Sequence, residues 1–342
     1  MSYVLPIRSR SAVTEELLAY LRAIASLDEI GEVIVVDGSD AVVFADFDAR
    51  CSDAVRHVRV DPDLERLANG KVAGVLTGLR LASQGYLVLA DEDVRYDAQA
   101  LGALRRALDH AEIVRPQNYF DPLPWHACLD TARTLINRVT GGDWPGTFGV
   151  RRSALERTGG YDGDVLFENL ELVRTVRAAG GRELRPLNLF VRRLPPKTHQ
   201  FWSQRVRQAY DELARPARLV TWLALFPALI VVIARFRWLG VGTAIVTPMI
   251  VAETGRRIGD GVRVFPAVAT VAAPLWLLER AVCAWVAIAA RFVLGGIPYR
   301  GRVLTRAATP YRTLARNYDL KHKRSTERRN ALAPTDPGAF PQ

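Results

Sequence analysis

The chain has 342 residues, of which 49% are hydrophobic and 24% charged, and its formal net charge is +10. The basic excess is local, because residues 295–330 hold ten Lys or Arg against two Asp or Glu. Basic residues that follow apolar segments favour anionic lipid headgroups over nucleic acid as their partner. The only cysteines, Cys51, Cys128 and Cys283, are too few and too scattered for a disulfide framework or a zinc site, which is typical of a reducing compartment.

The first hundred residues alternate strand and helix patterns. The predicted strands are Tyr3–Ile7, Glu32–Val36, Val55–Val60 and Tyr86–Ala90. Apolar residues recur at helical spacing in Thr14–Ser26, and a further helix is predicted to start at Asn69-Gly70-Lys71. This β-α-β order predicts an α/β fold with a mostly parallel sheet and right-handed crossovers.

The strand Tyr86–Ala90 stops abruptly at Asp91-Glu92-Asp93. Its unbroken apolar character is typical of a strand buried on both faces. Ligands of open α/β sheets bind beyond the carboxyl ends of the strands, and residues two apart on an extended chain point to the same side. Asp91 and Asp93 therefore suit Mg²⁺ or Mn²⁺ carrying a diphosphate. The alternative is a solvated acidic turn.

Other polar residues follow the predicted strands or open helices. Asp37, followed by Gly38 and Ser39, can accept a hydrogen bond from a nucleobase N–H, although Asp-Gly is also an ordinary turn signal. Lys71 at a helix start can face a diphosphate together with the backbone amides, or it is a surface residue. Trp144 lies in the glycine-dense loop Gly141–Gly149, where it either contacts a sugar or lipid headgroup or anchors a turn.

The second half of the chain contains long apolar segments. Phe201–Leu213 has the pattern of an amphipathic helix in the membrane interface. Leu219–Ala234 and Trp238–Ala252 are uncharged runs separated by three residues, which predicts a helical hairpin. The third apolar region, Val264–Leu294, contains Glu279-Arg280, and such charges are costly in lipid. This region therefore faces protein, breaks into two half-spans, or lies partly in the interface.

Eight short motifs occur in a specific order over most of residues 1–302. They are Asp37-Gly38-Ser39, Gly70-Lys71, Asp91-Glu92-Asp93-Val94, Gly146–Arg152, Gly159-Gly160-Tyr161-Asp162, Phe167–Leu172, Gln204–Gln208 and Tyr299–Arg302. In this order and spacing the chain resembles the family 2 glycosyltransferases of the GT-A fold. The motifs after residue 200 resemble those of the membrane-bound group, which includes ceramide glucosyltransferases and polysaccharide synthases.

The resemblance implies a role for several of these residues. Asp37 would read the nucleobase, Asp91 would contact the ribose or diphosphate, and Asp93 would hold the metal with Asp91 beside it. Gln204 and Arg207 would close over the diphosphate. The cofactor is expected to be Mg²⁺ or Mn²⁺, and the donor a uridine or guanosine diphosphate sugar.

The chain departs from the family pattern at two positions. Members with an alcohol acceptor usually carry Glu-Asp where this chain has Glu168-Asn169, and that Asp is the general base. An amide cannot take a proton. Either Glu168 or Glu171 substitutes, or the acceptor is already an anion such as a polyprenyl phosphate. A third reading is an inactive, membrane-anchored scaffold that binds nucleotide sugars. At the second position, Gln208 replaces the Trp of processive synthases, which argues against polymerisation.

We therefore expect an inverting, metal-dependent glycosyltransferase that acts on a lipid or lipid-linked acceptor. The catalytic GT-A domain is expected at residues 1–212, the membrane module at 213–302, with the hairpin at 219–252 and the third segment at 264–294, and a basic tail at 303–342. The positive-inside rule places the tail in the cytoplasm. If the catalytic domain is also cytoplasmic, the number of full membrane crossings is even. The last residues, 331–342, are predicted to be disordered.

Overall fold

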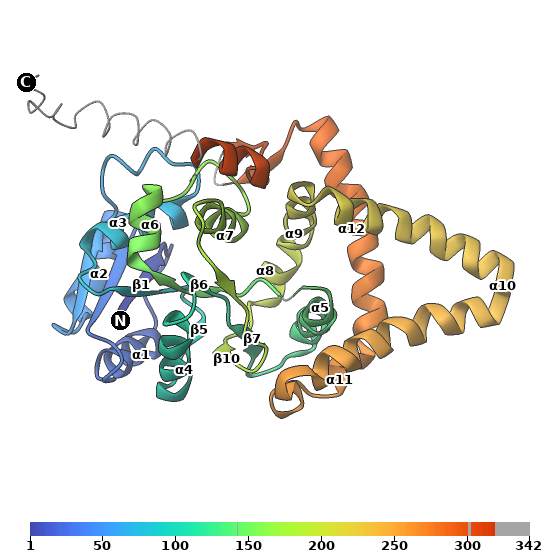
Figure 1. The fold of residues 1–342 in the computed structure, drawn as a ribbon, viewed down its shortest axis with the longest axis horizontal. Helices are drawn as coiled ribbons and strands as arrows, with labels where there is room; N and C mark the ends of the chain where they lie inside the picture. Colours follow the sequence, from blue (N-terminus) through green and yellow to red (C-terminus); the bar gives the residue numbers. More distant parts are fainter. Residues whose placement is uncertain (142, 300–301, 319–342) are drawn as a thin grey trace, which may run out of the picture.

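The computed structural model of the protein places an α/β domain beside a group of long helices (Figure 1). It describes residues 1–141, 143–299 and 302–318. The predicted disorder of residues 331–342 and the central pair of the motif Tyr299–Arg302 lie outside the described residues.

In the described part of the chain, the main sheet contains seven strands in the order β3-β2-β1-β4-β8-β6-β9. Their bounds are Ser2–Ile7 (β1), Glu32–Asp37 (β2), Val55–Arg59 (β3), Tyr86–Ala90 (β4), Ile113–Val114 (β6), Thr147–Arg151 (β8) and Glu183–Leu184 (β9). Only β8 runs antiparallel to both of its neighbours. The predicted α/β fold with a mostly parallel sheet is confirmed, and each of the four predicted strands lies within one residue of its expected bounds.

Helices cover both faces of this sheet. The first layer contains α1 (Glu15–Ala25), α2 (Ala41–Arg50) and α4 (Ala98–Leu108), and the second contains α3 (Gly70–Leu81), α6 (Arg152–Thr158) and α7 (Glu168–Ala178). Alternate residues of β1 enter the two cores, with Tyr3 and Leu5 in one and Val4 in the other. A strand between two apolar layers needs large apolar residues at every position. This explains the unbroken apolar runs in the sequence.

Helix α3 lies unusually close to strand β1. A Cβ atom at Gly74 would come within 2.6 Å of the Pro6 Cβ, and one at Gly78 would meet the Val4 side chain. The side chain of Asn69 caps the helix by accepting a hydrogen bond from the Lys71 amide at 3.1 Å. The close approach and the cap together place Lys71 at the carboxyl edge of the sheet.

A small second sheet lies next to this edge. Its strands are β5 (Val94–Arg95), β10 (Phe190–Arg193) and β7 (Gln117–Phe120), in that order. Arg193 pairs with Val94 in the antiparallel register, and the Leu194 amide donates to the Asp93 carbonyl at 2.8 Å. The second sheet therefore places a late part of the chain beside the acidic residues that follow β4.

The long helices form a V-shaped hairpin and a crossing helix (Figure 1). Helix α10 (Pro216–Arg257) reverses at Arg237, whose backbone has φ 50° and ψ −123°. Helix α12 (Ala273–Val293) crosses the open end of this V, and Trp222 of α10 meets Trp276 of α12 with ring centroids 5.6 Å apart. The short elements around them are η2 (Ile258–Arg263), α11 (Val268–Val271), β11 (Ile297–Tyr299) and β12 (Arg302–Leu304).

Two helical stretches in the described residues, Pro216–Arg263 and Ala273–Val293, are long and apolar enough to cross a membrane. Only 6% of the most apolar window of the first stretch is buried, and Trp238 beside its turn is 84% exposed. Of the three arrangements considered for the region around Glu279-Arg280, the break into two half-spans does not occur at this pair, which lies within one continuous helix, α12. Arg280 lies on the side of α12 that packs on protein, and its side chain is buried.

Helix α5 (Trp125–Thr140) joins the α/β domain to the long helices. Its residues Leu129, Leu135 and Ile136 share an apolar cluster with Trp222 and Trp276. The buried guanidinium of Arg138 on α5 donates to the Gly255 carbonyl at 2.9 Å, at the end of the hairpin.

The segment Phe201–Leu213 is not one continuous helix. It contains α8 (Thr198–Ser203), α9 (Arg205–Tyr210) and the 3-10 turn η1 (Asp211–Ala214), with Gln204 at the junction of the two helices. The ring of Phe201 and the side chain of Arg205 are buried, and Arg205 binds Asp130 of α5 at 2.9 Å. Much of the face expected to meet lipid instead packs on protein, because α5 contacts the ring of Phe201 and α12 lies against α9.

Candidate functional site

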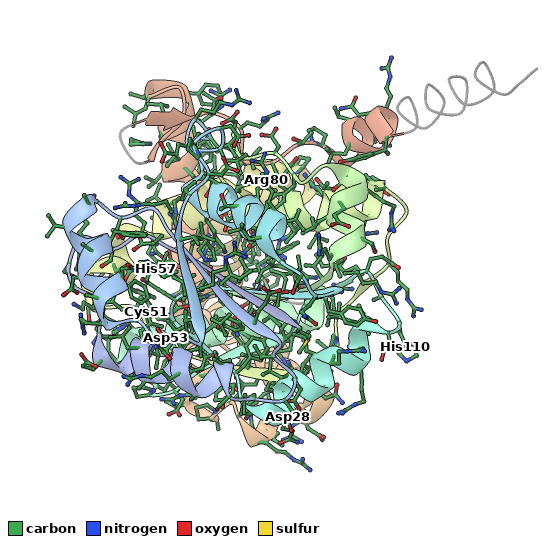
Figure 2. All side chains as sticks on the ribbon, turned by 90° about the vertical axis from the view of Figure 1, so that its left-hand side faces the viewer. Asp28, Cys51, Asp53, His57, Arg80 and His110 are labelled. Atoms are coloured by element: carbon green, nitrogen blue, oxygen red, sulfur yellow. The ribbon has the colours of Figure 1, made fainter. Side chains whose placement is uncertain are left out.

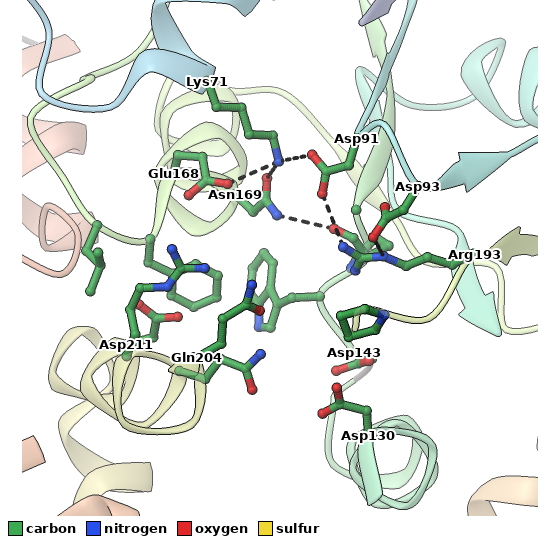
Figure 3. Close-up of a pocket in the computed structure, with 18 of the residues that line it drawn as sticks. Lys71, Asp91, Asp93, Asp130, Asp143, Glu168, Asn169, Arg193, Gln204 and Asp211 are labelled. Atoms are coloured by element: carbon green, nitrogen blue, oxygen red, sulfur yellow. Dashed lines mark hydrogen bonds and ion pairs between the residues drawn. The ribbon is translucent and has the colours of Figure 1, made fainter. Parts of the chain in front are cut away.

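A cavity of about 400 Å³ lies between the carboxyl edge of the main sheet and helices α9, α10 and α12 (Figure 3). Most of the residues singled out in the sequence line it, namely Lys71, Asp91, Asp93, Trp144, Glu168, Asn169, Gln204 and Arg207. Three do not, namely Asp37, Ser39 and Glu171. The cavity therefore gathers predicted residues from five separate parts of the chain.

Lys71 is at the centre of the polar contacts. Its Nζ lies 2.6 Å from Asp91 Oδ1 and 3.1 Å from Glu168 Oε1, and it donates to Asn169 Oδ1 at 3.3 Å (Figure 3). Burial acts to lower the pKa of Lys71, but the charges of Asp91 and Glu168 outweigh it and hold that pKa well above its ordinary value. Lys71 is therefore a fixed cation at the start of α3.

Arg193 holds the other side of the acidic pair. Its Nε donates to Asp93 Oδ2 at 2.9 Å, and its Nη2 reaches Asp91 Oδ2 at 3.5 Å. The second oxygen of Asp93, Oδ1, is buried without a hydrogen-bond partner among the described residues. Burial raises the pKa of Asp93, although the adjacent Arg193 opposes this shift.

The acidic pair can hold a divalent cation only with help from another ligand. Among the described residues, no group of three or more His, Cys, Asp or Glu side chains could hold a metal ion. Mg²⁺ and related ions commonly use one or two carboxylates and take their remaining ligands from substrate phosphates and water. Because Asp93 Oδ1 is a buried acceptor without a partner, Asp91 and Asp93 fit a cation that arrives with a diphosphate.

Asp37 and Ser39 lie at the same sheet edge but form internal contacts. The fully buried carboxylate of Asp37 accepts a hydrogen bond from the Ser39 amide at 2.7 Å and faces His57 Nε2 at 3.3 Å. Burial acts to raise the pKa of Asp37, but these two contacts lower it overall. The side chain of His57 (Figure 2) is almost fully buried and stacks on Phe44.

Helix α7 presents its acidic residues in two directions. Glu168 and Asn169 face the cavity, and Asn169 Nδ2 donates to the Pro145 carbonyl at 3.2 Å. Glu171 is fully buried, and its Oε2 accepts a hydrogen bond from the Thr309 amide at 2.6 Å. Burial raises the pKa of Glu171. Of the two carboxylates considered as bases, the cavity contains only Glu168.

Trp144 lines the cavity and is also packed on protein. The Arg115 guanidinium lies 4.1 Å from its ring centroid, and the Phe167 ring packs edge-on at 5.0 Å. The position of Trp144 is therefore compatible with a contact to a sugar or lipid headgroup and also with the anchoring of a turn. Its ring lines the cavity while it packs on Arg115 and Phe167.

Sequence reasoning missed several residues of this site. Arg193 gives no local signal, because its partner Asp93 is one hundred residues away. Asp211 lines the cavity with its Oδ1 unpartnered among the described residues, and burial raises its pKa to about 7. Arg215, Arg218 and Arg280 line the same cavity from α10 and α12. The one available signal was Arg280, a charge within an apolar segment.

No protein-family model matches the chain, and no protein of curated function does either. Among solved structures, the chain is similar to the mannosyltransferase PcManGT from Pyrobaculum calidifontis in complex with GDP-Man and Mn²⁺. That match has 17% identity, covers 83% of this chain and 86% of that chain, and has a TM-score of 0.48.

Two further similar structures are matched over smaller shares. Glucosyl-3-phosphoglycerate synthase from Mycobacterium tuberculosis, in complex with Mn²⁺, UDP and glucosyl-3-phosphoglycerate, has 20% identity over 45% of this chain and 57% of that chain, with a TM-score of 0.32. TarS from S. aureus has 13% identity over 62% of this chain and 39% of that chain, with a TM-score of 0.38. The chain therefore spans little more than half of the former and about two fifths of the latter.

Proposed function

We propose that the protein is a membrane-associated, inverting glycosyltransferase of family 2 with a GT-A catalytic domain. It transfers one sugar at a time from a nucleoside diphosphate sugar to a lipid or lipid-linked acceptor. The observation that carries this proposal is the pairing of Asp91 and Asp93 with Lys71 and Arg193 at the carboxyl edge of a parallel sheet, in a cavity that also touches α10 and α12.

The alternation of charge at this edge suits a metal–diphosphate group. Asp91 and Asp93 would hold Mg²⁺ or Mn²⁺, which as a Lewis acid stabilises the charge that develops on the leaving diphosphate. Lys71 and Arg193 are cations within reach of the same carboxylates, so they can contact the phosphate oxygens. The resemblance of the motifs supports the same roles, with Gln204 and Arg207 closing the cavity from α8 and α9.

Membrane attachment is supported by the exposed apolar surface of the long helices. The hairpin α10 and the outer face of α12 expose many large apolar side chains, and Trp125 and Trp202, with ring centroids 6.3 Å apart, are exposed near the start of α5 and on α8. Tryptophans are enriched where proteins meet the membrane interface. We propose that residues 213–302 form a multi-pass membrane module and that the catalytic domain and basic tail are cytoplasmic.

A donor-binding experiment tests the proposal. Purified protein in detergent is heated with UDP-glucose, UDP-N-acetylglucosamine or GDP-mannose, each with Mn²⁺ or with EDTA. A donor at one hundred times its Kd raises the free energy of unfolding by roughly 2.7 kcal/mol. We expect one donor to raise the melting temperature only with Mn²⁺. The proposal fails if none of a full panel of nucleoside diphosphate sugars does so.

An inactive scaffold remains a second candidate, because Asn169 stands at the family's base position and is occupied by hydrogen bonds to Lys71 and Pro145. Such a scaffold would bind the donor in the same experiment. Transfer of radiolabelled sugar to membrane lipid separates the two candidates, since only the enzyme forms a labelled product.

A further inference from the structure

The cavity has an acidic end and a basic end. At the sheet edge, Asp91, Asp93 and Glu168 meet Lys71 and Arg193. At the opposite end, helices α9, η1, α10 and α12 contribute four arginines and two carboxylates. The arginines are Arg207, Arg215, Arg218 and Arg280, and the carboxylates are Asp211 and Glu212. Even with both carboxylates ionised, this basic end carries an excess of two positive charges.

The carboxylates of the basic end do not saturate its arginines. Glu212 forms ion pairs with two of them. Its Oε1 lies 2.9 Å from Arg215 Nη2, and its Oε2 lies 3.3 Å from Arg218 Nε. Arg280 is 3% exposed, and its Nε has no hydrogen-bond partner among the described residues. The Nε of Arg215 is also buried without a hydrogen-bond partner among the described residues. Buried N–H donors without hydrogen-bond partners are costly, and a bound anion would offer acceptors to these guanidinium groups.

Asp211 does little to cancel this charge. Burial raises its pKa to about 7, so the carboxyl is partly protonated near neutral pH. Protonation of Asp211 increases the excess positive charge of the basic end from two to three.

The geometry also indicates which anion suits the basic end. Guanidinium groups bind phosphate through two parallel N–H···O bonds, and several arginines can share one phosphate. Arg215 and Arg218 lie at the start of α10, and Arg280 lies on α12, so the basic end is where the cavity meets the apolar helices. A phosphate attached to an apolar chain would place its charge among these arginines and its chain along the exposed helices.

We infer that the acceptor of this enzyme is a phosphate group, held by Arg215, Arg218 and Arg280, and that the sugar is transferred to one of its oxygens. This inference rests on the proposed function. The phosphate oxygen forms a bond to the anomeric carbon, and the bond from that carbon to the diphosphate oxygen breaks. The nucleoside diphosphate leaves with the electron pair, and a phosphate monoester becomes a phosphodiester.

This step requires no general base, because the attacking oxygen of a phosphate dianion carries no proton. The chain has an amide, Asn169, at the position where the resembled family carries its base. A phosphate acceptor therefore accounts both for the Nε donors of Arg215 and Arg280, which have no hydrogen-bond partner among the described residues, and for the amide at position 169.

Binding of a matched pair of probes tests the inference. Farnesyl monophosphate and farnesol share a chain and differ in the phosphate, and inorganic phosphate tests the headgroup without a chain. We expect the wild type to bind farnesyl monophosphate well above farnesol. Arg280→Gln should weaken that binding by roughly tenfold to a hundredfold, the usual effect of losing a hydrogen bond to a charged group.

The control variant is Arg291→Gln, which removes an exposed arginine from the same helix. It should leave the affinity for farnesyl monophosphate unchanged. If Arg280→Gln does not fold, Arg218→Gln provides the same test at a more exposed side chain. Unchanged binding of a nucleoside diphosphate with Mn²⁺ in each variant shows that the donor end is intact.

The outcomes separate this inference from the proposed function. Equal binding of farnesol and its phosphate, or full affinity in Arg280→Gln, overturns the phosphate site. Inorganic phosphate that binds as tightly as farnesyl monophosphate, and is lost in Arg280→Gln, supports the site with a water-soluble acceptor. Donor binding with sugar transfer to farnesol alone upholds the glycosyltransferase and overturns the phosphate acceptor. Absence of donor binding overturns the glycosyltransferase itself.

Discussion

Arg193 donates to Asp93 at 2.9 Å although one hundred residues separate them in the chain. The pair is held by the second sheet, where β10 lies antiparallel to β5 directly after the acidic residues. A cation bound to Asp93 would therefore share this carboxylate with a fixed guanidinium. Arg193 already balances the charge of Asp93 in the absence of a metal ion. A metal ion is therefore expected to bind together with a diphosphate, which brings further negative charge.

The first prediction concerns the metal. Asp93→Asn should abolish the dependence of nucleoside diphosphate affinity on Mn²⁺, because the substitution removes the charged oxygen that would hold the ion. Calorimetric titration with UDP and GDP, with and without Mn²⁺, measures this effect. Asp53→Asn, a change at an exposed residue far from the cavity, is the control. Metal-dependent affinity that survives in Asp93→Asn would show that Asp93 is not a ligand.

The second prediction concerns Glu168 and Glu171. General-base assistance is typically worth 10²–10⁴-fold in rate, so a hydroxyl acceptor predicts a loss of that size in Glu168→Gln. With a phosphate acceptor, we expect the rate of sugar transfer at saturating substrate to fall by less than about tenfold, because no proton is removed. Glu171→Gln should change the melting temperature rather than this rate, since Glu171 binds the Thr309 amide away from the cavity. A hundredfold loss in Glu168→Gln alone would favour the hydroxyl acceptor.

The third prediction follows from the pKa of Asp211, which is raised from the ordinary 3.8 to about 7. Between about pH 4 and pH 7, the unfolded chain loses this proton while the folded protein keeps it, so rising pH lowers the free energy of unfolding. Asp211→Asn cannot ionise. Its melting temperature should exceed that of the wild type by more at pH 8 than at pH 4.5, with a difference on the order of a few degrees.

The control for this experiment is Asp28→Asn, which removes one charge at an exposed position (Figure 2). It should shift the melting temperature little, and equally at both pH values. The assignment to Asp211 would be wrong if Asp211→Asn gave the same shift at pH 4.5 and pH 8.

The fourth prediction concerns membrane topology. After replacement of the three native cysteines by Ser, single cysteines are introduced by Trp238→Cys beside the turn of α10 and by Asp53→Cys on the far side of the α/β domain (Figure 2). If both arms of α10 cross the bilayer, a membrane-impermeant maleimide added to intact cells labels only Trp238→Cys. Labelling of neither until the cells are opened would show that the hairpin does not reach the outer surface.

The fifth prediction concerns the contact between α3 and β1. Gly74→Ala should lower the free energy of unfolding by about 1–3 kcal/mol, the usual cost of overpacking, because the new methyl group meets Pro6. Gly85→Ala is the matched control, since a Cβ there meets nothing within 4 Å. Melting temperatures of the two variants measure the difference. Equal stability would mean that α3 can move away from the sheet without cost.

Local patterns in the sequence were sufficient to predict four strands of the main sheet and to single out Lys71 and Asp91 as candidate binding residues. The strands follow from runs such as Tyr86–Ala90, and both residues lie at one edge because β4 ends and α3 begins there. Arg193 could not be predicted, because β10 carries no signal for its pairing with β5. The direction in which Glu171 points depends on the rotation of α7 about its axis. The sequence does not give this rotation, whereas the structure shows it through the hydrogen bond from the Thr309 amide to Glu171.

The segment Phe201–Leu213 shows a different limit of sequence reasoning. Alternating aromatic and arginine residues suit a lipid surface, but the same residues also suit a protein surface that offers a carboxylate. Arg205 binds Asp130, which lies on α5 and about seventy-five residues earlier in the chain. The sequence pattern alone could not distinguish a lipid surface from a protein surface, because aromatic rings beside arginines are favourable in both.

The packing of α5 on α10 and α12 makes these long apolar helices part of the folding unit. A recombinant fragment that ended at residue 212 would expose Leu129, Leu135 and Ile136, which lie buried in the cluster with Trp222 and Trp276. Each such side chain contributes roughly 1.5–3 kcal/mol when buried. The fragment would also lack Arg215, Arg218 and Arg280, and with them one wall of the cavity. Crystallisation and kinetic work will therefore require a chain that keeps α10 and α12.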